Sequence, residues 1–355
     1  MSHVQQPQAT RASVIVVNYN GGEELIQCIG SLMPSCSAND EVILVDNAST
    51  DGSADAVEQT FPDVRVIRSK TNLGFGGGNN LGMRVSTGEY LVFLNPDTLV
   101  NPGWLDALLA ALDENPQVGT VTSKILLLND RGRINTCGND THASGLTLCR
   151  GLGLPADMLN EPAEVGAVSG AAFAMRREIY ELLGGFDESF FLYMEDTDLS
   201  WRARLLGDHP LYVPDSIVYH DYALRFGPQK TFYQERNRYL MLLKTLRWRT
   251  LLGLLPVLLL AETVTWGFVL LREPNRLQNK LRAYAWIVRH WPQVMEKRKQ
   301  TQALRRISDR DLLACCTHRL TYEQTGDSAA ARLAHALLDP LFLVSQRIAL
   351  AVMEQ

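Results

Sequence analysis

Residues 13–46, SVIVVNYNGGEELIQCIGSLMPSCSANDEVILVD, contain the alternation that decides the fold class. The runs SVIVVN (13–18) and EVILVD (41–46) are rich in β-branched residues and bounded by turn residues, which is typical of buried strands. Between them, apolar residues recur at the spacing of one helix face: Leu25, Ile29 and Leu32. A strand, a helix and a second strand are therefore expected in this order.

The alternation continues along the chain. Further strands are expected at 64–69, 89–95 and 118–126, with helices over 51–61, from near Asn79, and over 104–115. Residues 125–165 have weak periodicity and are expected to be irregular or short-stranded. Strands that alternate with helices predict an α/β fold with a mostly parallel sheet flanked by helices.

Composition narrows the class of protein. The 355 residues are 46% hydrophobic and 21% charged, which excludes collagen-like, disordered and disulfide-scaffold proteins. The six cysteines form no C-x-x-C pair, so a zinc ribbon or thioredoxin-like motif is not expected. Residues 1–11 are polar and lack an apolar segment, and we expect a disordered tail and a reduced, cytoplasmic location.

Three polar residues lie at or just beyond the ends of expected strands: Asn18, Asp46 and Asp97. Ligands of such sheets bind outside the carboxyl ends of the strands, so this placement indicates a site. Each residue could instead be a helix cap or turn residue. Asp97 follows the hydrophobic run YLVFL and is placed to bind a divalent cation together with substrate phosphates.

The segment TNLGFGGGNNLG (71–82) is expected to be a glycine-rich loop. Glycines let backbone approach a ligand closely, and N–H groups at a helix start favour phosphate, which makes Asn72, Gly74 and Asn79 candidate ligand contacts. The segment is not G-x-G-x-x-G, and the chain has no G-x-x-x-x-G-K-[ST] motif. A dinucleotide-binding Rossmann domain is disfavoured, and a P-loop is absent.

An acidic cluster, Glu195, Asp196 and Asp198, lies within the largely apolar run 190–204. A helix start near Asp198, with Asp196 or Thr197 as its cap, would explain the cluster structurally. Alternatively, a carboxylate in an apolar pocket has a raised pKa and suits a general base. His220 ends the run PDSIVYH and is either a satisfied polar residue or a metal ligand.

Several ordered blocks resemble the family 2 glycosyltransferases of GT-A fold, and most closely the bacterial rhamnosyltransferase-like branch. They are VIVVNYN, VDNASTDGS, NLGFGGGNN, LNPDT, SGAAFAMRR and GGFDESFFLYMEDTDLSWR, and the likeness covers roughly residues 12–240. The resemblance implies a GT-A catalytic domain over 12–235, followed by a helical region over 236–355.

The resemblance also implies roles for the site residues. Nucleotide contacts are expected from Val17, Asn18, Tyr19 and Asp46. The D-x-D metal motif of the family appears here as Asn95-Pro96-Asp97, so Asp97 should carry most of the metal binding. Asp196, with Glu195 beside it, matches the catalytic base. His220 matches a histidine that completes the metal shell in related galactofuranosyl enzymes.

These roles imply an inverting transferase that uses Mg²⁺ or Mn²⁺ and a nucleotide-sugar donor, dTDP-L-rhamnose by likeness. A cell-envelope saccharide or a polyprenyl-linked saccharide would be the acceptor. Two other functions were weighed. Asn95 alone supports a catalytically degenerate, membrane-surface saccharide-binding protein. A nucleotidyltransferase would require a basic glycine-rich loop after the first strand, where this chain has the acidic NYNGGEE.

The C-terminal part differs in charge from the rest. Residues 1–224 hold 13 Lys and Arg against 29 Asp and Glu, whereas residues 225–310 hold 18 against 5. The apolar segment 250–271 is interrupted by Pro256 and Glu262, and a basic amphipathic helix is expected to follow. We expect helices that lie on an anionic cytoplasmic membrane surface; a buried helical pair or a span through 250–271 are the alternatives. Nucleic acid is not an expected partner.

Overall fold

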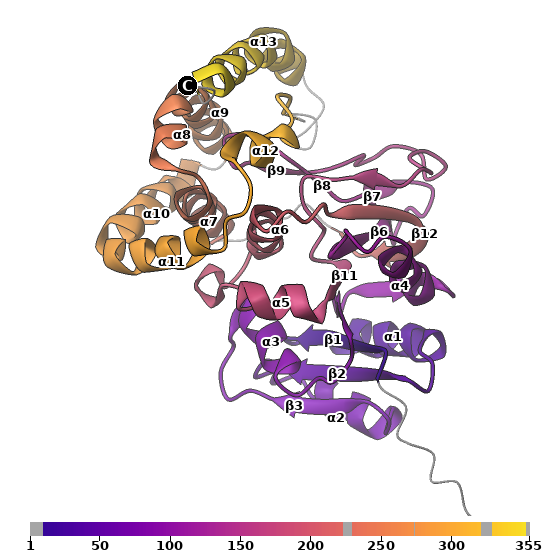
Figure 1. The fold of residues 1–355 in the computed structure, drawn as a ribbon. Helices are drawn as coiled ribbons and strands as arrows, with labels where there is room; N and C mark the ends of the chain where they lie inside the picture. Colours follow the sequence, from indigo (N-terminus) through magenta and orange to yellow (C-terminus); the bar gives the residue numbers. More distant parts are fainter. Residues whose placement is uncertain (1–9, 223–228, 273, 321–328, 353–355) are drawn as a thin grey trace, which may run out of the picture.

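The structure, a computed structural model, describes residues 10–222, 229–272, 274–320 and 329–352. It combines a twisted sheet with helices on both faces and a helical C-terminal region beside α6 (Figure 1). The main sheet contains β1 (Ala12–Asn18), β2 (Asp40–Asp46), β3 (Arg65–Arg68), β4 (Tyr90–Leu94), β5 (Thr98–Val100), β6 (Thr120–Leu127), β7 (Ile134–Thr136), β10 (Ala163–Glu164), β11 (Ala172–Arg176) and β12 (Leu211–His220). A two-stranded sheet pairs β8 (Asn139–Thr141) with β9 (Thr147–Cys149).

Strand order explains where a site can form. The order is β10-β12-β6-β11-β4-β1-β2-β3, with β5 paired to β12 and β7 to β6. Strands β1 to β4 run parallel, β12 runs parallel to β6, and β11 is antiparallel to both of its neighbours. The ends of β1, β2, β4 and β12 and the start of β11 therefore share one edge of the sheet. The expected mostly parallel sheet is confirmed.

Alternating side chains of the strands build two cores, one on each face of the sheet. Val14 and Val16 pack with α1 (Gly22–Leu32), α2 (Ser53–Thr60) and α4 (Trp104–Glu114). Ile15 faces the other way, toward the core that includes residues of α3 (Gly74–Met83), α5 (Arg177–Leu183) and α6 (Glu195–Leu205). Short 3₁₀ turns follow α1, at η1 (Met33–Ser35), and precede α6, at η2 (Glu188–Phe190).

The glycine-rich segment is a helix, which corrects the expected loop. Helix α3 begins at Gly74, five residues before Asn79. A Cβ on Gly78 would lie 2.6 Å from Val17 Cγ1, and one on Gly82 would lie 2.6 Å from Ile15 Cγ2. These two glycines therefore let the helix lie directly on the sheet. Local propensity disfavours helix by about 1 kcal/mol per glycine, and tertiary packing overrides it here.

The C-terminal region packs as a helical layer of its own. Its elements are α7 (Lys230–Thr245), α8 (Trp248–Gly253), α9 (Leu255–Arg272), η3 (Pro274–Arg276), α10 (Leu277–Arg289), α11 (Trp291–Ala303), α12 (Asp309–Ala314) and α13 (Ala329–Val352). Met241 and Leu254 share a core with Trp201 of α6. Helix α7 runs across the expected boundary at 235/236, and that division of the chain stays a prediction. Of the expected tail, residues 1–9 lie outside the described residues, whereas Arg11 pairs with Asp40 at 2.8 Å.

The segment 250–271 forms α8 and α9, which are separate helices. Glu262, which interrupts its apolar sequence, forms ion pairs with Arg238 and with Lys280, the latter at 3.1 Å. No described helix is both long and apolar enough to cross a bilayer. The expected single amphipathic helix after this segment is divided into α10 and α11 at His290.

Candidate active site

The first part of the site lies at the ends of β1 and β2, where Asn18 and Asp46 are register partners. Asn18 is fully buried, and its Nδ2 donates to the hydroxyls of Ser49 at 3.0 Å and Ser53 at 2.9 Å. Asp46 is also buried, and its Oδ1 accepts from Ser49 N at 3.2 Å. Tyr19, just beyond, is 54% exposed. Asn18 thus connects the end of β1 to the segment that follows β2, while the Tyr19 side chain is exposed and can contact a ligand.

Asn47 holds the start of α3 at the edge of the sheet where β1 and β2 end. The sequence patterns did not predict this residue. Its Oδ1 accepts from Leu73 N at 2.8 Å, and its Nδ2 donates to Asn72 Oδ1 at 3.0 Å. Asn72 Oδ1 also accepts from Gly74 N at 2.8 Å. Asn72 and Gly74 therefore lie at the site edge, whereas Asn79 is buried in α3 and bonds back within the helix. The only available signal for Asn47 was its position beside Asp46.

Asp97 and His220 meet because β5 and β12 are antiparallel. Their register places Thr98 opposite His220, and Asp97 Oδ1 lies 3.4 Å from His220 Nε2. Asn135, buried on β7, has its Oδ1 2.9 Å from His220 Nδ1. An amide oxygen can only accept, so Nδ1 donates to Asn135 and Nε2 is the ring nitrogen that faces Asp97. No sequence pattern had indicated Asn135.

The pair of Asp97 and His220 fits an open divalent-cation site. Asp97 Oδ1 is buried and has no hydrogen-bond partner among the described residues. A histidine nitrogen and a carboxylate oxygen are both suitable ligands for Mn²⁺. Within the described part of the chain, no cluster of three or more His, Cys, Asp and Glu could enclose a metal ion. Phosphate oxygens of a substrate would have to supply the remaining ligands.

The acidic pair lies at the first turn of α6, which starts at Glu195, three residues before the expected Asp198. The N-cap is Met194, so the prediction that Asp196 or Thr197 caps this helix is wrong. Asp196 Oδ2 instead accepts from Gly170 N at 2.8 Å, and its Oδ1 accepts from Thr197 N at 2.7 Å. These bonds fix the carboxylate in one orientation.

A short chain of contacts connects this acid to the cation pair. Gly170, which donates to Asp196, precedes Ala171, whose carbonyl accepts from Asn95 N at 2.9 Å. Asn95 is followed by Pro96 and Asp97. The arrangement follows from β11, which begins beside the end of β4 and pairs Ala172 with Leu94. The candidate base and the candidate metal ligands therefore belong to one site.

The two acids differ in their surroundings. Burial, and secondly the charge of Asp196, raise the pKa of Glu195 to about 8. Burial also raises the pKa of Asp196, but the hydrogen bonds from Gly170 and Thr197 act against that rise. Glu195 is buried, and its Oε2 has no hydrogen-bond partner among the described residues, whereas Asp196 is part-exposed. Asp196 is therefore the more exposed of the two acids.

The sequence of the chain is similar to those of known proteins. The model of glycosyl transferase family 2 matches residues 13–184. An N-acetylglucosaminyl-diphospho-decaprenol L-rhamnosyltransferase from Mycobacterium tuberculosis is 32% identical over 238 residues, which cover 60% of this chain and 77% of that protein. The chain belongs to glycosyltransferase family 2. The resemblance inferred from its motifs is confirmed, and this family 2 glycosyltransferase is an enzyme of the hexosyltransferase class.

Solved structures agree on the fold of this glycosyltransferase. S. aureus TarS 1–349 in complex with UDP-GlcNAc has a TM-score of 0.57 and 19% identity, over 97% of this chain and 89% of that one. GalNAc-T7 with UDP, GalNAc and Mn²⁺ has a TM-score of 0.55 and 20% identity, over 67% of this chain and 48% of that one. Both likenesses support the GT-A fold.

Proposed function

We propose that this glycosyltransferase transfers L-rhamnose from dTDP-L-rhamnose to a lipid-linked saccharide, with inversion at the anomeric carbon. The observation that carries the reaction type is the continuous path from Asp196 through Gly170 and Asn95 to Asp97 and His220. This path supports a base and a cation site at one edge of the sheet. The choice of sugar and acceptor rests on the mycobacterial relative, whose name specifies both.

In the proposed complex, the nucleotide lies along the ends of β1 and β2, against Val17, Asn18, Tyr19 and Asp46. Asn72 and Gly74 at the start of α3, with Asn79 behind them, and Asn95 complete this donor side. Asp97 and His220 would hold a divalent cation, Mg²⁺ or Mn²⁺, which neutralises charge on the departing diphosphate. Asn135 keeps the His220 ring oriented for this contact.

Asp196 acts as the general base. It takes the proton from the acceptor hydroxyl while that oxygen forms a bond to the anomeric carbon, and the bond from this carbon to the diphosphate breaks. One in-line displacement inverts the centre, so no covalent nucleophile is needed. Glu195, buried behind Asp196, limits how much negative charge the pair carries, because its raised pKa favours its protonated form at neutral pH.

A donor panel tests the proposal. Purified protein is assayed with dTDP-rhamnose, UDP-galactofuranose, UDP-glucose and GDP-mannose, with and without Mn²⁺, on a short-chain polyprenyl-diphosphate GlcNAc acceptor. We expect metal-dependent turnover with dTDP-rhamnose, and Asp196→Asn should bind the donor but not transfer it. Turnover with another donor would overturn the sugar assignment. Donor binding without turnover by wild-type protein would favour the saccharide-binding alternative.

We further propose that the enzyme works peripherally on an anionic membrane, at its cytoplasmic face. Helix α13 exposes apolar side chains at helical spacing: Leu337, Leu341, Val344 and Ile348. Helices α8 and α9, against which α13 packs, expose Leu252, Leu255 and Leu259. Arg249 and Arg347 are exposed on the same helices and would meet anionic headgroups. A bilayer suits this combination, because a polyprenyl-linked acceptor is itself held there.

A further inference from the structure

The loop 184–194 connects α5 to α6 and delivers Glu195 and Asp196 to the site. Its backbone is unusual, since three residues other than glycine have a positive φ: Phe191 (62°), Tyr193 (67°) and Met194 (70°). L-residues rarely adopt this conformation, and it persists only where surrounding contacts impose it. Asp196, the proposed base, is thus preceded by a segment whose backbone conformation depends on contacts with other parts of the protein.

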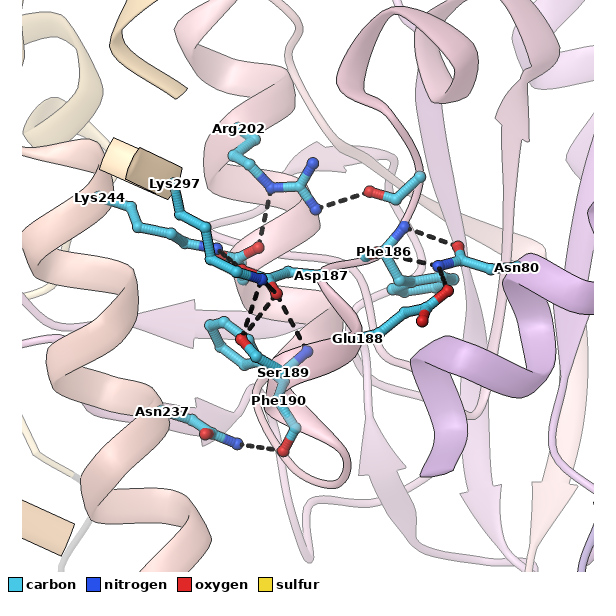
Figure 2. Close-up of polar contacts among 12 residues, drawn as sticks. Asn80, Phe186, Asp187, Glu188, Ser189, Phe190, Arg202, Asn237, Lys244 and Lys297 are labelled. Atoms are coloured by element: carbon cyan, nitrogen blue, oxygen red, sulfur yellow. Dashed lines mark hydrogen bonds and ion pairs between the residues drawn. The ribbon is translucent and has the colours of Figure 1, made fainter. Parts of the chain in front are cut away.

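Helix α7 contributes a buried side chain, Asn237, that contacts three carbonyls of this loop. Asn237 is fully buried, and its Nδ2 lies 3.0 Å from the carbonyl oxygens of Phe190 and Leu192 and 2.7 Å from that of Tyr193. Figure 2 shows the Asn237 amide directed from α7 at the loop. Its Oδ1 accepts from Arg236 Nε at 2.9 Å, and the other end of that guanidinium bonds Phe190 O at 2.8 Å.

Charged groups anchor the first half of the loop. Asp187 pairs with Lys244 of α7 at 2.6 Å and with Lys297 of α11 (Figure 2). Lys244 also pairs with Asp198 of α6 at 2.8 Å. On the other side, Asn80 of α3 donates to Phe186 O at 3.0 Å. These anchors hold residues 186–188. The positive-φ residues are held by Asn237 together with Phe75 N of α3, which donates to Phe191 O at 2.9 Å.

We infer that Asn237 is a positioning residue, which sets the catalytic loop and, through it, the direction of Asp196. The amide supplies donors to three carbonyls in or next to the positive-φ segment. Without it, the oxygens of Leu192 and Tyr193 would lose this donor, and the loop would relax toward ordinary φ values. The inference rests on the proposed role of Asp196 as base, but the effect on the loop can be measured separately.

The test is Asn237→Ala in the full chain, with hydrogen exchange, nucleotide affinity and turnover as readouts. Exchange of amides in 186–196 should accelerate by about tenfold or more, while β1 and α1 stay protected. Affinity for dTDP with Mn²⁺, by calorimetry, should stay within about twofold, since the donor side lies on other elements. Turnover should fall by about 100-fold, the loss expected when a reacting group is displaced by about 1 Å.

Met241→Ala is the matched control, because Met241 is buried one turn further along α7 and packs in the helical core. It should destabilise the protein yet leave loop exchange and turnover near wild type at a temperature where both variants are folded. Asn237→Asp, which keeps the size but turns an oxygen toward the carbonyls, should behave like Asn237→Ala.

Unchanged loop exchange in Asn237→Ala would overturn the inference, as would an equal loss of turnover in Met241→Ala. If wild-type protein transfers no sugar from any donor while Asn237→Ala opens the loop, then the proposed function fails and the role of Asn237 in the loop stands.

Discussion

Replacing Glu195 by glutamine should make the protein more stable above pH 5, by an amount that grows with pH. Glu195 is buried, and its pKa rises from 4.5 to about 8 on folding. Below pH 4.5 the Glu195 carboxyl is protonated in both the folded and the unfolded state, so its raised pKa does not lower the free energy of unfolding. Between pH 4.5 and 8 the unfolded chain is ionised while the folded protein must take up a proton, so stability falls as pH rises.

The structure gives the size of this effect. A rise in pKa from 4.5 to about 8 corresponds to roughly 5 kcal/mol in full, at about 1.36 kcal/mol per pH unit. At pH 7 the expected penalty is about 3 kcal/mol, since only the interval from 4.5 to 7 contributes. Glutamine is isosteric and neutral at every pH, so Glu195→Gln should remove this penalty.

Urea unfolding of wild type and Glu195→Gln between pH 5 and 8, followed by tryptophan fluorescence, measures the difference directly. Carboxylates that do not interact with Glu195 titrate alike in both proteins and cancel, whereas Asp196, whose charge raises the pKa of Glu195, contributes to the measured difference. Glu23→Gln, on the exposed face of α1, controls for the loss of one surface carboxylate. A stability difference that does not change with pH would refute the reasoning. Transfer activity should survive in Glu195→Gln, because Asp196 remains; complete loss would make Glu195 the base.

Four other variants test separate parts of the structure. Asp97→Ala should abolish the gain in dTDP affinity that Mn²⁺ produces, and calorimetry with and without Mn²⁺ would expose an intact metal effect. Gly78→Ala should destabilise the protein, since overpacking costs about 1–3 kcal/mol and the helix gains only about 1. Gly30→Ala, with 3.7 Å to its nearest neighbour, should be neutral or stabilising by the same unfolding assay. Leu341→Glu should reduce flotation with anionic vesicles while changing stability by about 0.5 kcal/mol or less; unchanged flotation would exclude α13 as the contact.

The strands and their polar ends could be predicted because both are local properties of the sequence. An apolar run followed by a turn residue defines β1, β2 and β4 without reference to the rest of the chain, and the runs of β1 and β2 are rich in β-branched residues. Since β1, β2 and β4 are parallel, their ends meet at one edge, which placed Asn18, Asp46 and Asp97 correctly at the ends of their strands. The contribution of each residue to nucleotide binding stays a prediction.

Features set by tertiary contacts could not be predicted in this way. The glycine run of α3 has poor helix propensity, and it is helical because Gly78 and Gly82 allow contact with β1. The predicted start of α6 is too late, because its N-cap, Met194, has a positive φ that no sequence rule anticipates. Asn135 and Asn237 lie in ordinary sequence, and only their partners on distant strands and loops indicate a role.

The C-terminal region shows how charge along a chain differs from charge on a surface. Its excess of basic residues favoured a membrane or another anionic partner, yet several of these residues are buried: Lys230, Arg236, Arg238, Lys244, Lys280 and Arg298. Lys244 meets Asp187 and Asp198 of the catalytic domain, where acidic residues predominate. Part of the charge asymmetry is therefore satisfied inside the molecule. The same ion pairs hold the loop before Asp196, so the helical region contributes to the active site as well as to any contact with a membrane.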